Sequence, residues 1–96
     1  MFTLRQTPEF ARWRKGLRDD RAKARIARRL ERLEDGHLGD AKMFDGIGEL
    51  RIDHGPGYRL YFCVRGREVV ILLVGGDKSS QDRDIRRAIQ MAKEAR

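Results

Sequence analysis

Arg51 and Arg59 are the first residues that suggest chemistry, because the chain around them is predicted to fold into a β-hairpin. Polar and apolar residues alternate on both sides of Gly55-Pro56-Gly57, which is typical of two half-buried strands joined by a tight turn. If the apolar residues of both strands share the buried face, a loop over His54–Pro56 places Arg51 opposite Arg59. Two arginines directly opposite each other repel unless an anion lies nearby. The hairpin therefore predicts a surface that faces phosphate.

The overall charge of the chain also favours an anionic partner. The 96 residues include 22 Lys and Arg against 15 Asp and Glu, for a formal net charge of +7. This balance suits RNA, DNA or an acidic protein as partner, and the length predicts one domain over residues 1–96. No apolar run is long enough to span a membrane, the start does not resemble a signal peptide, and Cys63 has no second cysteine to pair with. We therefore expect a cytoplasmic protein without a membrane partner.

The first third of the chain predicts a short strand followed by a helical hairpin. Residues 2–6 alternate and suit a strand, and Thr7-Pro8-Glu9 is a typical helix start, with Thr7 as the N-cap. A second helix is predicted to be capped by Asp20 and to end near Gly36. The apolar residues that recur at helical spacing in these two segments are Phe10, Trp13 and Leu17, then Ala22, Ile26, Leu30 and Leu33.

The segment that precedes the hairpin and the strand that follows it are predicted from their composition. Residues 36–47 suit a glycine-rich connection, with Met43, Phe44 and Ile47 as its anchors in the core. Residues 69–74 are continuously apolar, so this strand is expected in the interior of the sheet with both faces covered.

A last helix completes the predicted fold. Ser79 or Ser80 is expected to cap it, and its apolar stripe consists of Ile85, Ala88, Ile89 and Ala92. The helices are segregated from the run of strands, which predicts the α+β class. We expect an N-terminal strand and helical hairpin packed on a mostly antiparallel sheet of about four strands, with a C-terminal helix.

The outer face of the predicted helical hairpin is rich in Lys and Arg, and two interpretations of it stay open. It is either a solvated helical face supported by Glu31 and Glu34, or an electrostatic footprint for nucleic acid. This face carries no aromatic residue to stack on bases, so nucleic acid would be bound there through its backbone. The basic residues are Arg12, Arg14, Lys15, Arg18, Arg21, Lys23, Arg25, Arg28, Arg29 and Arg32.

Several motifs give the chain a resemblance to a known family. They are Thr7-Pro8-Glu9-Phe10, Gly48-Glu49-Leu50-Arg51, Gly57-Tyr58-Arg59-Leu60-Tyr61-Phe62, and Gly75-Gly76-Asp77-Lys78-Ser79-Ser80-Gln81-Asp82-Arg83-Asp84-Ile85. Over nearly its full length, and in the same order of elements, the chain resembles the RelE/ParE superfamily of toxins from bacterial toxin–antitoxin pairs. Within it, the chain resembles the HigB-like, phage Gp49-like branch, whose members are often named addiction module killer proteins.

The resemblance implies an enzyme, an mRNA endonuclease of a type II toxin–antitoxin system. RelE-type toxins are small basic proteins that enter the ribosomal A site and cut mRNA there without a metal or other cofactor. The 2′-hydroxyl attacks the adjacent phosphate and leaves a cyclic phosphate and a free 5′-hydroxyl. The reaction needs a base near the 2′-hydroxyl, cations around the charged phosphorane and an acid for the leaving oxygen. The implied partners are mRNA on the ribosome and a cognate antitoxin protein.

The resemblance also implies which cations would act on the phosphate. Arg59 lies where the family usually keeps a phosphate-stabilising arginine, and Arg51 lies where basic residues of the preceding strand contribute. Lys78 follows the last strand, where a catalytic or phosphate-binding cation is common. Gln81 and Arg83 would bind RNA together with these three residues.

Proton transfer has three candidates in the sequence. Glu49 and Tyr61, which the predicted register places opposite each other, are the groups nearest to the two arginines. His54 in the predicted turn is a further group that could move a proton.

Two other functions stay open at this point. Several RelE-type enzymes carry a Tyr or His near the C-terminus, whereas residues 83–91 contain neither. The same fold serves ParE-like proteins that poison DNA gyrase without nuclease activity, and this departure favours them. The chain could also be a degenerate toxin that only binds its antitoxin.

Overall fold

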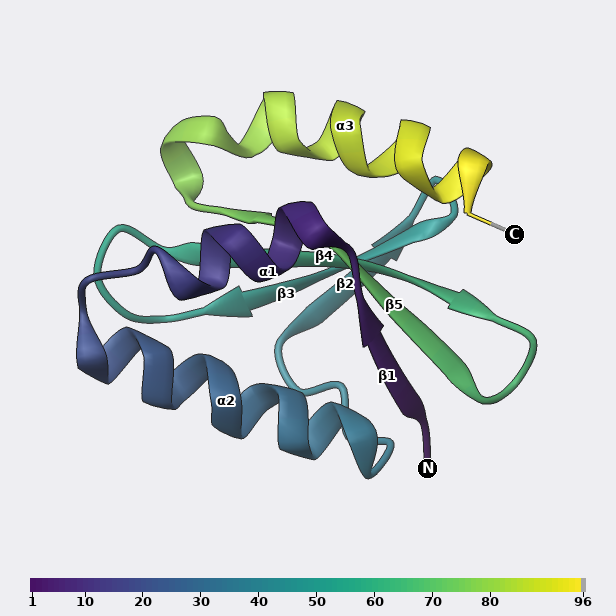
Figure 1. The fold of residues 1–96 in the computed structure, drawn as a ribbon, viewed down its shortest axis with the longest axis horizontal. Coiled ribbons are helices and arrows are strands. Elements are labelled where there is room, and N and C mark those ends of the chain that lie inside the picture. The colour runs from purple at the N-terminus through teal and green to yellow at the C-terminus, as the bar shows by residue number, and fades with distance from the viewer. Residues whose placement is uncertain (96) are drawn as a thin grey trace.

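The structure, a computed structural model, describes residues 1–95 and contains a five-stranded sheet with helices on both faces (Figure 1). The described elements, in chain order, are β1 (Thr3–Gln6), α1 (Pro8–Lys15), α2 (Asp20–Glu34), β2 (Ala41–Phe44), β3 (Ile47–Ile52), β4 (Tyr58–Arg65), β5 (Val69–Gly76), a 3₁₀ turn (Lys78–Ser80) and α3 (Gln81–Glu94). The strand order across the sheet is β1-β5-β4-β3-β2. The α+β class predicted from the sequence is confirmed.

The sheet is mostly antiparallel, with β1 as its parallel edge strand. Strand β1 pairs with β5 in parallel, and the pairs β2–β3, β3–β4 and β4–β5 are antiparallel. Strand β5 therefore lies inside the sheet, as its continuous apolar run predicts.

The sheet has five strands, because β2 forms within the segment that the sequence suggested was only a connection. This strand has four residues, and a turn with positive φ at Asp45 (50°) and Gly46 (81°) links it to β3. A short edge strand beside two glycine-containing segments has almost no periodicity of its own. Phe44 is half-buried and Ile47 is buried as expected, but Met43 is 54% exposed and is not a core anchor.

Two apolar layers hold the helices on the sheet. Helices α1 and α2 cover one face, where Phe10 and Ile26 pack with Leu50, Leu60 and Phe62. Helix α3 covers the other face with Ala88 and Ala92, in a cluster that includes Ile47, Tyr61, Cys63, Leu73 and Val74. Residues 47, 49 and 51 of β3 alternate with the first layer, so the side chains of Glu49 and Arg51 lie on the α3 side of the sheet.

The helix starts follow local capping rules, with one correction to the predicted caps. Thr7 caps α1, as predicted, and accepts a hydrogen bond from Phe10 N at 3.0 Å. Helix α2 is capped by Asp19, one residue before the predicted Asp20, because the carboxylate of Asp19 reaches the free amides of Arg21 and Ala22. Ser80 is the N-cap residue of α3, one of the two predicted positions, although its side chain makes no capping hydrogen bond there.

Gly48 is required by the packing of the ring of Phe62 on the neighbouring strand. A Cβ at Gly48 would lie 2.2 Å from Cζ of Phe62. We expect Gly48→Ala to lower the free energy of unfolding by about 1–3 kcal/mol, because the buried ring must move. Urea denaturation of the full chain measures this loss.

Gly16 provides the matched control for this substitution. Its φ of −79° suits any residue, and its Cβ would meet nothing nearer than the carbonyl oxygen of Arg12, at 3.3 Å. Gly16→Ala should change the free energy of unfolding by less than about 0.5 kcal/mol. Equal losses in the two variants would contradict the argument from the Phe62 contact.

Candidate phosphate-binding site

Three of the predicted cations line one open pocket at the end of the sheet, beside the turn between β3 and β4. The pocket has a volume of about 430 Å³. Arg51, Arg59 and Lys78 all line it, and its other lining residues are Asp40, Ile52, Asp53, His54, Gly55 and Gly57. The structure thus brings together side chains from β3, β4 and the 3₁₀ turn after β5.

The register between β3 and β4 places the two arginines. Arg51 pairs with Arg59 across the ladder, and Glu49 pairs with Tyr61, as the alternation of apolar residues predicts. Lys78 reaches the same place from the other side, where its stem lies across Gly57. A Cβ on Gly57, whose φ is +78°, would lie 3.0 Å from Cε of Lys78.

Arg59 is a nearly buried cation whose hydrogen-bond partners are neutral. The residue is 9% exposed. Its Nη1 donates to the carbonyl oxygens of Gly57 and Tyr58, at 3.1 and 3.2 Å, and its buried Nε has no partner. Within residues 1–95 it forms no ion pair with a carboxylate. A guanidinium so placed is oriented by the backbone while its charge stays available to an anion.

Arg51 is more exposed and has an acidic partner. Its Nε and Nη2 donate to Oδ1 of Asp40, at 3.1 and 2.7 Å. The side chains of Arg51 and Asp40 are 41% and 57% exposed. An ion pair this exposed contributes about 0–1 kcal/mol, so a phosphate can compete with Asp40 for Arg51.

Lys78 is exposed and forms no ion pair within the described residues. Its position is set by Asp77, which accepts hydrogen bonds from the amide and hydroxyl of Ser79 at 2.8 and 2.5 Å. The bond from the Ser79 hydroxyl holds the pKa of Asp77 below its ordinary value. The turn is therefore held by its own side chains, and the Lys78 ammonium stays free to bind an anion.

Glu49 and Tyr61 lie beneath α3 and do not line the pocket. Glu49 is 3% exposed and accepts a hydrogen bond from Nε2 of Gln81, at 3.0 Å. Tyr61 is fully buried, and its hydroxyl has no partner with hydrogen-bond geometry. Burial, and after it the Glu49 carboxylate, raise the pKa of Tyr61 above its ordinary value. In this arrangement neither group is accessible for proton transfer to a ligand in the pocket.

Arg83 and Gln81 belong to a second, adjoining surface at the start of α3. The side chain of Arg83 is 78% exposed, and its Nε lies 3.8 Å from Asp84. Lys78 lines both this surface and the pocket. The other residues that line the second surface are Ser79, Ser80, Gln81, Asp82, Arg83 and Arg86.

The structure adds a pair that the sequence could not show, His54 with Asp19. Nε2 of His54 lies 2.9 Å from Oδ2 of Asp19. The hydrogen bond from His54 is the main cause that lowers the pKa of Asp19. His54 is the histidine of the predicted turn, but the link to a residue 35 positions earlier depends on how the α1–α2 corner packs beside that turn.

Arg29 holds the segment before β2 against the end of β3. Its Nη1 donates to the carbonyl oxygen of Arg51, and its Nη2 donates to the carbonyl oxygens of Leu38 and Asp40 at 3.0 and 3.1 Å. Arg29 thus fixes the backbone of both members of the Arg51–Asp40 pair. The sequence alone does not distinguish Arg29 from the other nine basic residues of the helical hairpin.

Four arginines of α2 continue the positive surface from the pocket. A shallow depression of about 260 Å³ is lined by Arg25, Arg28, Arg29 and Arg32. Ile52 and Asp53 line both this depression and the pocket. Within residues 1–95, Arg25, Arg28 and Arg32 form no ion pair with a carboxylate. These three arginines, called the α2 row below, therefore place unpaired positive charge beside the pocket.

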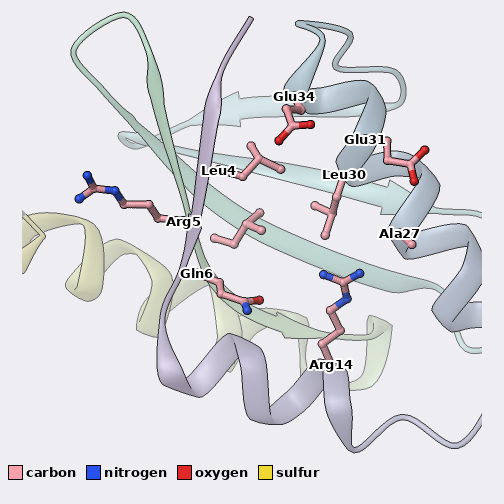
Figure 2. Close-up of a pocket in the computed structure, with 9 residues that line it drawn as sticks. Leu4, Arg5, Gln6, Arg14, Ala27, Leu30, Glu31 and Glu34 are labelled. Atoms are coloured by element: carbon pink, nitrogen blue, oxygen red, sulfur yellow. The ribbon is translucent and has the colours of Figure 1, made fainter.

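A separate hollow of about 300 Å³ lies between β1 and α2 (Figure 2). Leu4 and Leu30 line it, Arg14 reaches in from α1, and Glu31 and Glu34 lie along α2. The hollow borders β1, which is an edge strand of the sheet. Its lining combines apolar side chains with the carboxylates of Glu31 and Glu34, which would repel a phosphate.

Among residues 1–95, no group of three or more His, Cys, Asp or Glu side chains is arranged to hold a metal ion. None of the helices described is long and apolar enough to cross a membrane.

The order and arrangement of the elements match those of a chain in a solved structure, the crystal structure of the intact E. coli RelBE toxin–antitoxin complex. The TM-score is 0.65 with 18% sequence identity, and the match covers 80% of this chain and 96% of that chain. At this identity the match shows the fold, and the protein is an α+β domain of the RelE type.

The family follows from sequence comparison. Residues 13–96 match the family described as Phage derived protein Gp49-like (DUF891). An uncharacterized protein of Haemophilus influenzae is 49% identical over 92 residues, which cover 95% of this chain and 93% of the relative. The chain belongs to the Gp49-like family, and the resemblance drawn from its sequence motifs is confirmed at the level of family and fold.

Replacing Arg29 with lysine should lower the stability of the fold. The two guanidinium nitrogens of Arg29 donate to three carbonyl oxygens, and a single ammonium nitrogen cannot reach all three. We expect Arg29→Lys to lower the free energy of unfolding by about 1–2 kcal/mol. Arg28→Lys is the control, since Arg28 is exposed and has no side-chain hydrogen bond in residues 1–95. Thermal and urea denaturation should separate the two variants, and equal stability would contradict the role of Arg29.

The Tyr61 hydroxyl should add nothing to stability. We expect Tyr61→Phe to leave the free energy of unfolding unchanged or to raise it by up to about 1 kcal/mol, because a buried hydroxyl without a partner is removed. Tyr61→Ala should instead cost about 3–5 kcal/mol, since the ring fills the layer beneath α3. A loss above about 1 kcal/mol in Tyr61→Phe would mean that the hydroxyl has a hydrogen-bond partner.

Proposed function

We propose that this protein is the toxin of a toxin–antitoxin pair and acts as a ribosome-dependent mRNA endonuclease. The observation that carries the proposal is the Arg59 guanidinium. It is 9% exposed, has no carboxylate partner within residues 1–95, and shares one pocket with Arg51 and Lys78. An unpaired cation at this burial is costly to keep unless it binds an anion.

The pocket suits attack of a 2′-hydroxyl on the adjacent phosphate. The phosphorane that forms carries more negative charge on its non-bridging oxygens than the starting diester does. Arg59 is held in place by the Gly57 and Tyr58 carbonyl oxygens before any ligand arrives. A donor that is already oriented in a partly dry site stabilises developing charge without reorganisation. Arg51 and Lys78 are more exposed and would close on the phosphate from either side.

The charge around the pocket supports a long anionic ligand. The α2 row of Arg25, Arg28 and Arg32 shares its rim with the pocket. On a helix these positions recur at about one-turn spacing, so the guanidinium groups can contact successive phosphates of one strand. This supports the second of the two interpretations of the basic face, an electrostatic footprint for nucleic acid.

An antitoxin is the protein partner that we propose. The chain has the fold of a chain in the E. coli RelBE toxin–antitoxin complex. Its edge strand β1 borders the hollow of Figure 2, which is lined by both apolar and charged side chains. An extended or amphipathic segment of an antitoxin could pair with such an edge and place its side chains in the hollow.

One observation favours a second candidate, a gyrase poison without nuclease activity. Glu49 and Tyr61, the two proton-transfer candidates on the strands that carry Arg51 and Arg59, are 3% and 0% exposed and do not line the pocket. A protein that only binds its target would need no exposed proton-transfer group. The experiment below is chosen to separate the two candidates.

We expect inducible expression of the wild type to arrest growth and to produce discrete cuts in abundant mRNAs, mapped by primer extension. Arg59→Ala should lower the cleavage rate by about 10²–10³-fold, because it removes the oriented donor. Arg67→Ala, an exposed arginine in the turn at the other end of β4, should cleave like the wild type.

Three results would overturn the assignment. Growth arrest with DNA damage and uncut mRNA would favour the gyrase candidate. Cleavage that survives Arg59→Ala would remove Arg59 from the site. Absence of both arrest and cleavage in the wild type would leave a chain that only binds its antitoxin.

A further inference from the structure

The proposed cleavage needs a group that can take a proton from the 2′-hydroxyl, and the residues that line the pocket limit which groups can do so. The titratable and charged side chains that line it are Asp40, Arg51, Asp53, His54, Arg59 and Lys78. Asp40 is already paired with Arg51. Imidazole changes its protonation near neutral pH, which suits a general base at cellular pH. Glu49 and Tyr61 do not line the pocket.

His54 is held in place by a carboxylate that is itself fixed. Nε2 of His54 lies 2.9 Å from Oδ2 of Asp19. The other oxygen of Asp19, Oδ1, accepts hydrogen bonds from the amides of Arg21 and Ala22 at 2.9 and 3.2 Å. The N-cap of α2 therefore fixes the carboxylate, and the carboxylate fixes the imidazole. Within residues 1–95 the ring forms no hydrogen bond through its second nitrogen, Nδ1.

We infer that His54, oriented by Asp19, is the general base of the proposed RNA cleavage. This inference rests on the proposed function. With Asp19 at Nε2, the ring presents Nδ1 as the free acceptor. Nδ1 takes the proton of the 2′-hydroxyl, the 2′-oxygen forms a bond to phosphorus, and the bond from phosphorus to the 5′-oxygen breaks. The leaving 5′-oxygen takes a proton from water, and the imidazolium returns its proton to the hydroxide so formed. The products are a 2′,3′-cyclic phosphate and a 5′-hydroxyl.

Asp19 acts through His54 and is a positioning residue. The hydrogen bond from His54 is the main cause that lowers the pKa of Asp19, so the carboxylate stays ionised near neutral pH. Its negative charge stabilises the imidazolium that forms when the proton arrives. The same link also ties the β3–β4 turn to the α1–α2 corner, so the test must separate catalysis from stability.

The test uses the full chain acting on a defined mRNA bound to ribosomes, with single-turnover rates measured across the pH range around neutrality. We expect His54→Gln to lower the maximal single-turnover rate by about 10²-fold or more, to change the half-saturating protein concentration little, and to remove the rise of rate with pH. His37→Gln is the control, because His37 is the second histidine of the chain and lies in an exposed loop. It should keep the rate and the pH profile of the wild type.

Asp19→Asn tests the positioning role with little change to the fold, because Asn is as good an N-cap as Asp. We expect it to lower the single-turnover rate by about tenfold or more with the helix content retained. His54→Ala with added imidazole is the third variant, and imidazole should restore its rate at least about tenfold if the ring acts chemically. Urea denaturation of each variant without RNA measures the structural contribution separately.

The outcomes distinguish the inference from the proposed function. Cleavage by the wild type that His54→Gln leaves unchanged would overturn the His54 assignment alone. A loss of rate that follows the loss of stability, with no imidazole rescue, would also overturn it and leave His54 as a structural contact. No cleavage by the wild type would overturn both proposals.

Discussion

The register between β3 and β4 is the constraint on which the candidate site depends. Leu50 and Leu60 are opposite each other in the layer beneath α1 and α2, and this fixes Arg51 opposite Arg59 on the other face. A slip of either strand by one residue would move its arginine into the apolar layer and its leucine out of it. The hydrophobic core thus selects the register, and the position of the two charges follows from that selection.

Close approach of α3 to the sheet explains why Glu49 and Tyr61 are buried while the residues that line the pocket stay accessible. Gly76 lies opposite Arg59, and a Cβ there would fall 1.9 Å from Oδ2 of Asp84 on α3. With only a hydrogen at this position, the start of α3 can lie low over β4 and β5. It then covers Glu49 and Tyr61, while none of its residues lines the pocket that Arg59 lines.

The parts of the fold that depend on periodicity could be predicted from the sequence, and the parts that depend on distant neighbours could not. The alternation around Gly55-Pro56-Gly57 was enough to predict the Arg51–Arg59 pairing. Strand β2 was missed because four edge residues between glycines have too short a pattern. The exposure of Glu49 and the contact between His54 and Asp19 depend on how helices pack on the hairpin, and no local pattern contains that information.

The shape of the pocket has a consequence for the proposed reaction. It is an open hollow of about 430 Å³, with two exposed cations and one nearly buried guanidinium, and it borders a row of arginines. In the proposed reaction these groups would attract and stabilise phosphate, but they offer few contacts that would fix a flexible strand in the geometry of in-line attack. Effective intramolecular geometry is worth about 7–11 kcal/mol of a reaction barrier, and this site supplies little of it alone. A substrate already held by a larger particle would bring that orientation with it. The proposed dependence on the ribosome therefore rests on two features of the pocket: its positive charge and its few contacts that could orient the RNA strand.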